Sequence, residues 1–192
     1  MNDDIILMLT NQHMIGRGIF AIPHSTFLDM NVCFMTRTET LEHGEVTGFD
    51  LDTLLYREAE KRGIKDMEKL TEQALVNTER YLPPVVEQIS EGMICITNDQ
   101  HTFGAAAMMY KGLLQNVSET MGSDMYILPS SIHEVICIKP DMNDPGDLYE
   151  YIQYVNKECL EPKDVLSRSL YYYEADRQRL LIAYGDRNQA VS

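Results

Sequence analysis

Short apolar runs alternate with amphipathic segments along the whole chain, and this alternation restricts the fold more than any other feature. The apolar runs have the length and the β-branched or aromatic content of strands. The segments between them carry apolar residues at three-to-four spacing, which is typical of helices that pack by one face. The predicted strands are residues 4–9, 27–36, 93–96, 125–128, 132–138, 170–173 and 179–183. The pattern therefore predicts an α+β fold, with a mixed, mainly antiparallel sheet or sheets flanked by about five helices.

The predicted strand at residues 27–36 shows which side of a sheet should be buried. Successive side chains of a strand point to opposite faces. One face of this strand is apolar throughout, and its members are Leu28, Met30, Val32 and Phe34. We expect this face to pack against the core.

The polar segments that follow predict loops and helix ends. Residues 39–48 contain two glycines and few apolar side chains, which predicts a loop. Asp50 or Asp52 is then expected to cap a helix that runs to Arg62. A short helix is expected to end at Ile89, after a pair of prolines.

A faint internal repeat predicts two related halves. Residues 9–13 resemble residues 96–101, and residues 22–25 resemble residues 128–131, although the spacings differ. Each half would then be a small α+β unit, and the two would pack as one compact body. The predicted divisions are an N-terminal half at residues 1–90, a C-terminal half at 91–185 and a frayed tail at 186–192.

The charge of the chain excludes some partners. Thirty acidic residues face sixteen basic ones, for a net charge of −14. Nucleic acids are bound mainly through lysine and arginine contacts to phosphate, so we expect no nucleic-acid partner. An anionic membrane surface would also repel the chain, and a protein partner is the class that the acidity leaves open. The oligomeric state cannot be inferred from these numbers.

The cysteines and the hydropathy pattern indicate the cytoplasm. Cys33, Cys95, Cys137 and Cys159 are widely separated and form no C-x-x-C motif, so reduced thiols are expected. The chain has no apolar run of 18 residues, and its acidic N-terminus lacks a signal-peptide pattern. We therefore expect neither a membrane span nor secretion.

The segment from Pro129 to Val135 brings a serine, a histidine and a carboxylate close together in sequence. On a strand, Ser131 and His133 would share one face while Glu134 points to the other. A catalytic triad needs the carboxylate behind the imidazole, so a local triad is not expected. The serines of a strand entrance more often bond backbone groups, and Pro129 is expected to end the preceding strand.

Two weaker motifs have equally ordinary interpretations. Asparagines and histidines from both halves could meet and hold a metal if the halves pack face to face, but scattered histidines need no such explanation. These residues are Asn11, His13, His24, Asn98 and His101. The small residues at 104–107 could admit a phosphate at a helix start, but no phosphate-binding glycine motif accompanies them, and helix packing explains them better. We expect neither a metal nor a cofactor.

Several segments resemble an uncharacterised domain-of-unknown-function family common in gut Clostridia and related Firmicutes. The most specific segment is Leu128–Val135, and the likeness extends over nearly the whole chain. Further matching segments are Ile22–His24, Phe27–Asp29, Leu82–Pro84, Gly104–Ala107 and Tyr171–Tyr173. The resemblance implies the α+β architecture and a bacterial cytoplasmic protein, and it implies no activity.

Three functional hypotheses follow. The first is a non-enzymatic binding or regulatory protein that acts through protein–protein contacts, using its acidic surface and one exposed sheet edge. The second is a hydrolase-type enzyme whose site is assembled between the halves. Its candidate catalytic residues are His24, Asp29, Ser131, His133 and Glu134. The third is an acidic nucleic-acid mimic from a mobile element.

Overall fold

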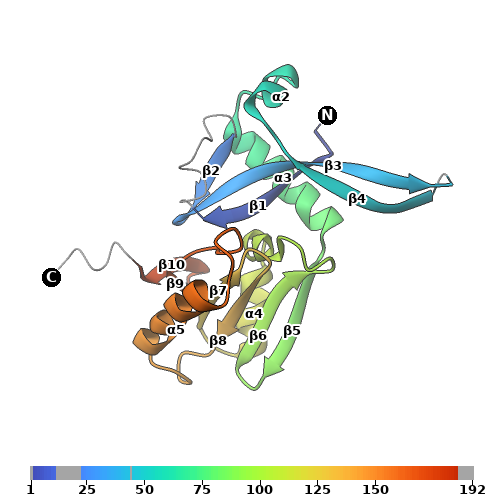
Figure 1. The fold of residues 1–192 in the computed structure, drawn as a ribbon. Coiled ribbons are helices and arrows are strands. Elements are labelled where there is room, and N and C mark those ends of the chain that lie inside the picture. Colours follow the sequence, from blue (N-terminus) through green and yellow to red (C-terminus); the bar gives the residue numbers. More distant parts are fainter. Residues whose placement is uncertain (1, 12–22, 44, 186–192) are drawn as a thin grey trace.

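The computed structural model describes residues 2–11, 23–43 and 45–185 of the chain. It contains two antiparallel sheets with helices packed around them, which confirms the α+β fold (Figure 1). The first sheet comprises β1 (Ile5–Asn11), β2 (His24–Phe27), β3 (Met30–Glu42) and β4 (Glu45–Thr53). The second sheet has the order β10-β9-β7-β8-β6-β5, and its strands are β5 (Pro84–Ser90), β6 (Met93–Asn98), β7 (Met125–Ser131), β8 (Glu134–Ile138), β9 (Leu170–Glu174) and β10 (Arg179–Tyr184).

The helices lie between and beside the sheets. They are α2 (Tyr56–Lys61), α3 (Met67–Tyr81), the 3-10 helix η1 (Gly104–Met109), α4 (Leu113–Met121) and α5 (Pro145–Glu158). Helix α3 packs on the first sheet and leads directly into β5, whereas α5 packs on β7, β9 and β10. The Asp66 carboxylate accepts hydrogen bonds from the backbone amides of Glu68 and Lys69, so it caps α3.

Helix α3 also covers the outer edge of β1. The Asn77 side chain donates a 2.8 Å hydrogen bond to the Ile5 carbonyl, and the Thr78 hydroxyl accepts one of 2.9 Å from the Leu7 amide. An edge strand otherwise presents unpaired backbone groups to solvent. Two side chains of a helix therefore take the place of a neighbouring strand.

One continuous hydrophobic core joins the two sheets. It includes Leu7 and Phe34 from the first sheet together with Ile96 and Ile127 from the second, all fully buried. The two sheets therefore bury their apolar faces in the same cluster of side chains. The chain passes from the first sheet to the second at Pro83 and Pro84, whereas the sequence pattern placed the division at residue 90.

The strand predicted at residues 27–36 is interrupted by a tight turn. Leu28 and Asp29 form the turn between β2 and β3, and Leu28 has a left-handed backbone with φ of 57°. Met30, Val32 and Phe34 are buried as predicted, but Leu28 is 37% exposed because it lies in the turn. The predicted apolar face is therefore confirmed for the residues that remain in the strand.

Four other predictions of local structure are wrong. The predicted loop at residues 39–48 is instead strand at 39–42 and 45–48, and both Asp50 and Asp52 lie in β4, so neither caps a helix. The short helix expected before Ile89 is β5, and Pro129 lies within β7 instead of ending it. Proline is tolerated there because the ladder shifts register directly after it.

The apolar spacing of residues 103–121 predicts one long helix, but the structure has two, η1 and α4. Tyr110 has an extended backbone, and Gly112 has a φ of 79°, so the chain turns between η1 and α4. Gly104 starts η1 where a side chain would collide with the backbone carbonyl of His133 and with the Thr97 hydroxyl. Close backbone approach therefore explains the glycine at position 104, in line with a packing role.

Candidate interaction surface

Strand β3 is longer than its neighbours, and its outer half leaves the body of the protein. Pairing with β1 ends at Thr36, and pairing with β2 ends at Cys33. Beyond Thr36, β4 is the one described strand that pairs with β3. Residues 37–42 and 45–51 therefore form a two-stranded ribbon that projects from the body (Figure 1).

The ribbon has one apolar face and one polar face. Arg37 is paired with Leu51, Glu39 with Phe49, and Leu41 with Val46, so these side chains lie on one face. The opposite face carries Thr38, Thr40, Glu42, Glu45 and Asp50. The apolar side chains of the first face are Leu41, Val46, Phe49 and Leu51.

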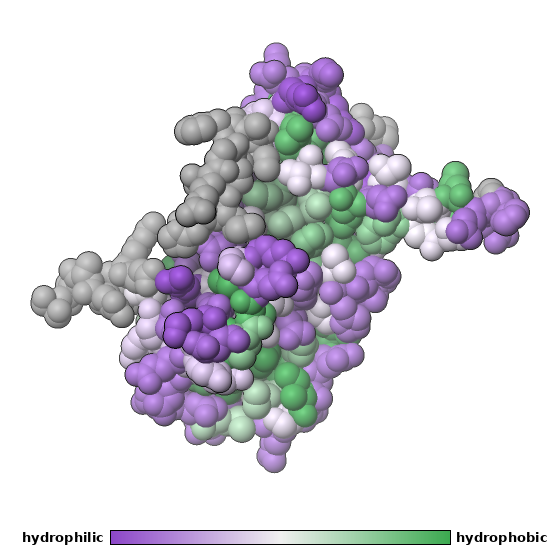
Figure 2. All heavy atoms as spheres, in the orientation of Figure 1, coloured by the Kyte–Doolittle hydropathy of each residue, from purple (hydrophilic) through white to green (hydrophobic). Residues whose placement is uncertain are grey.

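The apolar face is covered at the root of the ribbon and uncovered toward its tip. Phe49 and Leu51 are half-buried against a small cluster formed by Met35, Leu82 and neighbouring side chains. Leu41 and Val46 are 61% and 54% exposed, and apolar atoms are visible along the ribbon in Figure 2. A cross-strand pair of large apolar side chains thus lies in solvent, beyond the reach of the protein's own core.

Arg37 fixes the root of the ribbon. Its guanidinium lies between the rings of Phe49 and Tyr81, 4.9 and 4.2 Å from their centroids, and forms a 3.0 Å ion pair with Glu39. Its Nε atom is buried without a hydrogen-bond partner among the described residues. Stacking and the ion pair hold this side chain flat and stiffen the point where the ribbon leaves the sheet.

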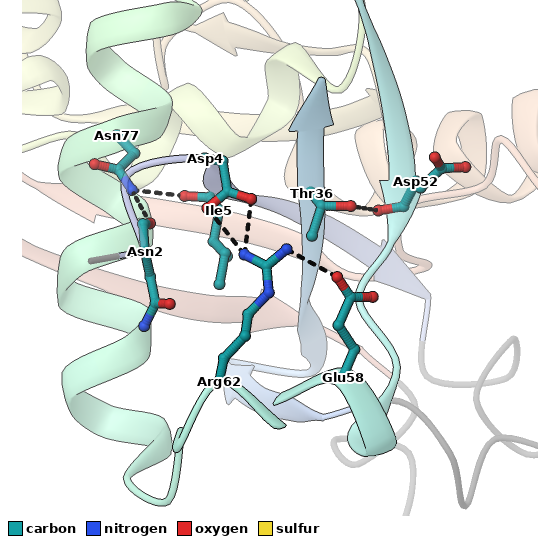
Figure 3. Close-up of polar contacts among 8 residues, drawn as sticks. All are labelled: Asn2, Asp4, Ile5, Thr36, Asp52, Glu58, Arg62 and Asn77. Atoms are coloured by element: carbon teal, nitrogen blue, oxygen red, sulfur yellow. Dashed lines mark hydrogen bonds and ion pairs between the residues drawn. The ribbon is translucent and has the colours of Figure 1, made fainter. Parts of the chain in front are cut away.

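A second group of polar contacts holds the strand beside the root (Figure 3). Arg62 donates to both oxygens of Asp4, at 2.9 and 2.7 Å, and to Glu58 at 2.8 Å. The hydrogen bond with Asp4 raises the pKa of Arg62, which keeps the guanidinium charged. The Asp4 carbonyl in turn accepts a 2.7 Å hydrogen bond from the Arg37 amide. These contacts join α2, β1 and β3 at one point.

The ribbon is acidic. It carries Glu39, Glu42, Glu45 and Asp50 against one arginine, Arg37, whose charge is paired within the ribbon. Its apolar stripe is therefore bordered by negative charge.

Asp29, one of the predicted catalytic residues, connects the two halves. Its carboxylate accepts hydrogen bonds from the hydroxyls of Ser167 (3.2 Å), Ser169 (2.7 Å) and Tyr171 (2.6 Å). All three donors lie in or just before β9 of the second sheet. The role that this geometry supports is a polar connection between the β2–β3 turn and the second sheet.

Ser131 ends β7 and His133 lies in the turn before β8, but the two are not arranged as a nucleophile and its base. The Ser131 hydroxyl accepts the backbone amide of His133 at 3.0 Å. The Nδ1 atom of His133 accepts the Phe103 amide at 3.2 Å, and its Nε2 lies 3.8 Å from Asp164. Both ring nitrogens thus have neighbours other than the Ser131 hydroxyl, which a general base would have to contact.

Glu134 and His24 lie in still other surroundings. Glu134 accepts hydrogen bonds from Ser130 at 2.9 Å and from the Cys95 thiol at 3.7 Å. Burial, together with the Glu134 charge, raises the pKa of Cys95 to about 11, so this thiol stays protonated and is a poor nucleophile. His24 begins β2 in the first sheet, opposite Cys33 on β3.

The residues considered for a metal are used locally or fall outside the described part. The Asn98 side chain accepts the amides of Gln100 and Thr102 and donates to the Thr102 carbonyl, so it closes the turn that contains His101. Asn11 ends β1, and His13 lies outside the described residues. Within the described ranges, no three His, Cys, Asp or Glu side chains are grouped as metal ligands.

One open depression of about 490 Å³ lies between the end of α4 and the β9–β10 turn, bordered by Glu119, Asp124 and Asp176. Asp124 accepts hydrogen bonds from the Tyr172 hydroxyl and the Ala175 amide, at 2.8 and 2.9 Å. These bonds explain Asp124 as the residue that holds the turn.

Sequence reasoning missed the ribbon, although a signal was present. Threonine recurs at every second position from Thr36 to Thr40, and Phe49 and Leu51 alternate with aspartates. Both patterns have the period of a strand. The two glycines and the many charged residues of this segment indicate a loop more strongly.

The fold and this surface define an α+β protein with two antiparallel sheets and a projecting acidic ribbon. A model described as a family of unknown function (DUF5688) matches residues 86–175, which agrees with the resemblance to an uncharacterised domain family. The match covers the second sheet from within β5 to the end of β9 and excludes the ribbon. No curated protein and no solved structure matches the chain. Within the described ranges, no helix has both the length and the apolar character needed to cross a membrane.

Proposed function

We propose that this chain is a protein-binding module without catalytic activity of its own, and that the ribbon is its docking element. One observation carries the proposal: the apolar face of the ribbon continues past the core into solvent, where Leu41 and Val46 lie side by side. Exposed apolar patches bordered by polar residues are typical of protein interaction sites.

The energetic argument concerns the two exposed side chains. Complete burial of a leucine or valine side chain is worth roughly 1.5–3 kcal/mol. Docking therefore gains from both residues together, since Leu41 and Val46 form a cross-strand pair. The stiff root around Arg37 reduces the conformational entropy that would be lost when the ribbon binds.

The hydrolase alternative has no comparable support. It requires an imidazole that can accept a proton from a nucleophile, and the ring nitrogens of His133 lie beside the Phe103 amide and Asp164. We place the binding module in the cytoplasm, and its buried free thiols at Cys33, Cys95 and Cys137 support that location.

Site-specific photocrosslinking tests the proposal. A photoreactive phenylalanine analogue replaces Leu41 in the full chain, and the same analogue replaces Val76 as the control, because Val76 on α3 is equally exposed at 62%. In the source cells, we expect one discrete protein adduct from position 41, identified by mass spectrometry and reproduced with the purified partner. The control position should not form it, and Val46→Asp in the same chain should abolish it. Identical adduct patterns from both positions would refute the ribbon as a docking element.

A further inference from the structure

The outer half of β3 presents a regular backbone edge. The Arg37 amide donates to the Asp4 carbonyl on the side of β1, whereas the Phe34 carbonyl accepts the Leu54 amide on the side of β4. Because backbone groups of a strand alternate between its two edges, Glu39 and Leu41 direct theirs to the same side as Arg37. β1 begins at Ile5, opposite Thr36, and in the described part of the chain no strand lies along this edge farther out.

The other edge of the ribbon is less regular. The register between β3 and β4 shifts at Thr40 and Leu41, which face Gly48 and Val46, so Thr47 is the extra residue. A bulge bends the strand that carries it and disturbs its ladder. The bulge lies in β4, and the evenly spaced edge is therefore that of β3.

The side chains along this edge define what a further strand would need. A strand beside β3 would place alternate side chains on the apolar face, next to Leu41, and the others on the face of Thr38, Thr40 and Glu42. The first set would bury apolar surface. The second set would lie next to Glu42, with the carboxylates of Glu45 and Asp50 one strand farther away on β4, so positive charge would be favoured there.

We propose that the partner contributes an extended segment of alternating apolar and basic residues, which adds as a strand to the edge of β3 from Arg37 to Leu41. This inference rests on the proposed function, because it names the partner chemistry of the same ribbon. The added strand lies along the same edge of β3 as β1, farther out than Asp4. Its basic side chains lie on the polar face of the ribbon, which carries Glu42, Glu45 and Asp50.

Charge argues against two other occupants. A second copy would bring two chains of net charge −14 together, with one acidic ribbon against another. Nucleic acid would bring phosphates to the same carboxylates. A basic protein segment is the occupant that complements both faces.

Synthetic peptides on the full chain test the proposal. Three capped peptides of equal length are compared: alternating valine and lysine, alternating valine and glutamate, and the valine–lysine sequence with its backbone amides methylated. Binding is measured by fluorescence anisotropy, and the docking edge by amide hydrogen exchange. We expect the valine–lysine peptide alone to bind, and to slow exchange at Glu39 and Leu41 by at least about tenfold, because both amides enter a ladder.

A matched pair of variants separates local from overall charge. E42Q/E45Q removes two carboxylates from the ribbon, and E60Q/E72Q removes two exposed carboxylates from α2 and α3. We expect the first to weaken peptide binding about fivefold and the second to have a much smaller effect, since exposed ion pairs act over short range.

Other results would overturn the inference. Equal binding of the lysine and glutamate peptides would exclude a basic partner, and full binding of the methylated peptide would exclude strand addition. A concentration-dependent dimer with protected amides at Glu39 and Leu41 would identify a second copy as the occupant. If the crosslink at Leu41 forms but its target segment is neither basic nor extended, this inference fails while the proposed function stands. If position 41 forms no specific adduct, both this inference and the proposed function are refuted.

Discussion

Replacing Asp29 by alanine should destabilise the whole protein, although Asp29 lies in a partly exposed turn. The carboxylate accepts three hydroxyl hydrogen bonds, and each bond to a charged group is worth about 1.5–3 kcal/mol. Tyr171 is fully buried, so its hydroxyl would lose its acceptor without gaining water. Ser167 and Ser169 are also buried, and rotation of their short hydroxyls can offset only part of the loss. We therefore expect a loss of about 3–5 kcal/mol, less than the sum of three bonds.

Urea unfolding of two single variants and their combination measures this effect. Tyr171→Phe removes one donor and should cost about 1–2 kcal/mol. If the bond between the two side chains is responsible, the double variant should lose about 1–2 kcal/mol less than the sum of the single losses. Asp29→Asn keeps the size of the side chain and should be intermediate.

Two results would refute this reasoning. A loss below about 1 kcal/mol for Asp29→Ala would place the effect in the range of an ordinary surface substitution. Strict additivity of Asp29→Ala and Tyr171→Phe would show that the two side chains are not energetically coupled, whatever their 2.6 Å separation.

Three further predictions concern backbone space, thiols and alkaline pH. Gly104→Ala should lower the free energy of unfolding in urea by about 1–3 kcal/mol, because its Cβ would meet the His133 carbonyl. Gly112→Ala lies in open space with a φ of 79°, so it should lose about 1–2 kcal/mol from backbone strain alone. A thiol reagent should modify the native protein at the exposed Cys159 and reach the three buried cysteines only after unfolding, so a C159S variant should be unreactive until urea is added. Burial and the neighbouring Asp29 carboxylate raise the pKa of Tyr171 well above its ordinary value of 10.0. The contribution of Tyr171 to stability is therefore complete below about pH 10 and is lost as the pH rises further. The decline in unfolding free energy at alkaline pH should be shallower in Tyr171→Phe.

Much of the second sheet could be predicted from the sequence because its strands are buried. The runs that contain Ile94, Ile127 and Cys137 are apolar, and Cys137 pairs with both Ile94 and Ile127 in the sheet. The ribbon could not be recognised in the same way, since a strand that leaves the core needs no continuous apolar face. Its threonines and aspartates have the strand period, but charges and glycines indicate a loop more strongly.

The predicted site residues show a different limit of the sequence. Asp29, Ser131 and Glu134 are indeed in polar networks, which their clustering at strand entrances indicated. Ser131 and Glu134 bond to groups two and four residues away, whereas the partners of Asp29 depend on tertiary packing over 138 to 142 positions. Ser167, Ser169 and Tyr171 carried no local signal that joined them to Asp29.

The Asp29 connection also has a consequence for the order of events during synthesis. Its donors follow Asp29 by 138 to 142 positions, so almost the whole chain must leave the ribosome before this contact can form. At about 5–20 residues per second, roughly 7–28 s pass between the synthesis of Asp29 and the synthesis of its three donors. The ribbon pairs residues that are close in sequence, and the cluster at its root extends along the chain only as far as Phe103. A nascent chain can therefore present the ribbon to a partner while the β2–β3 turn still awaits the second sheet.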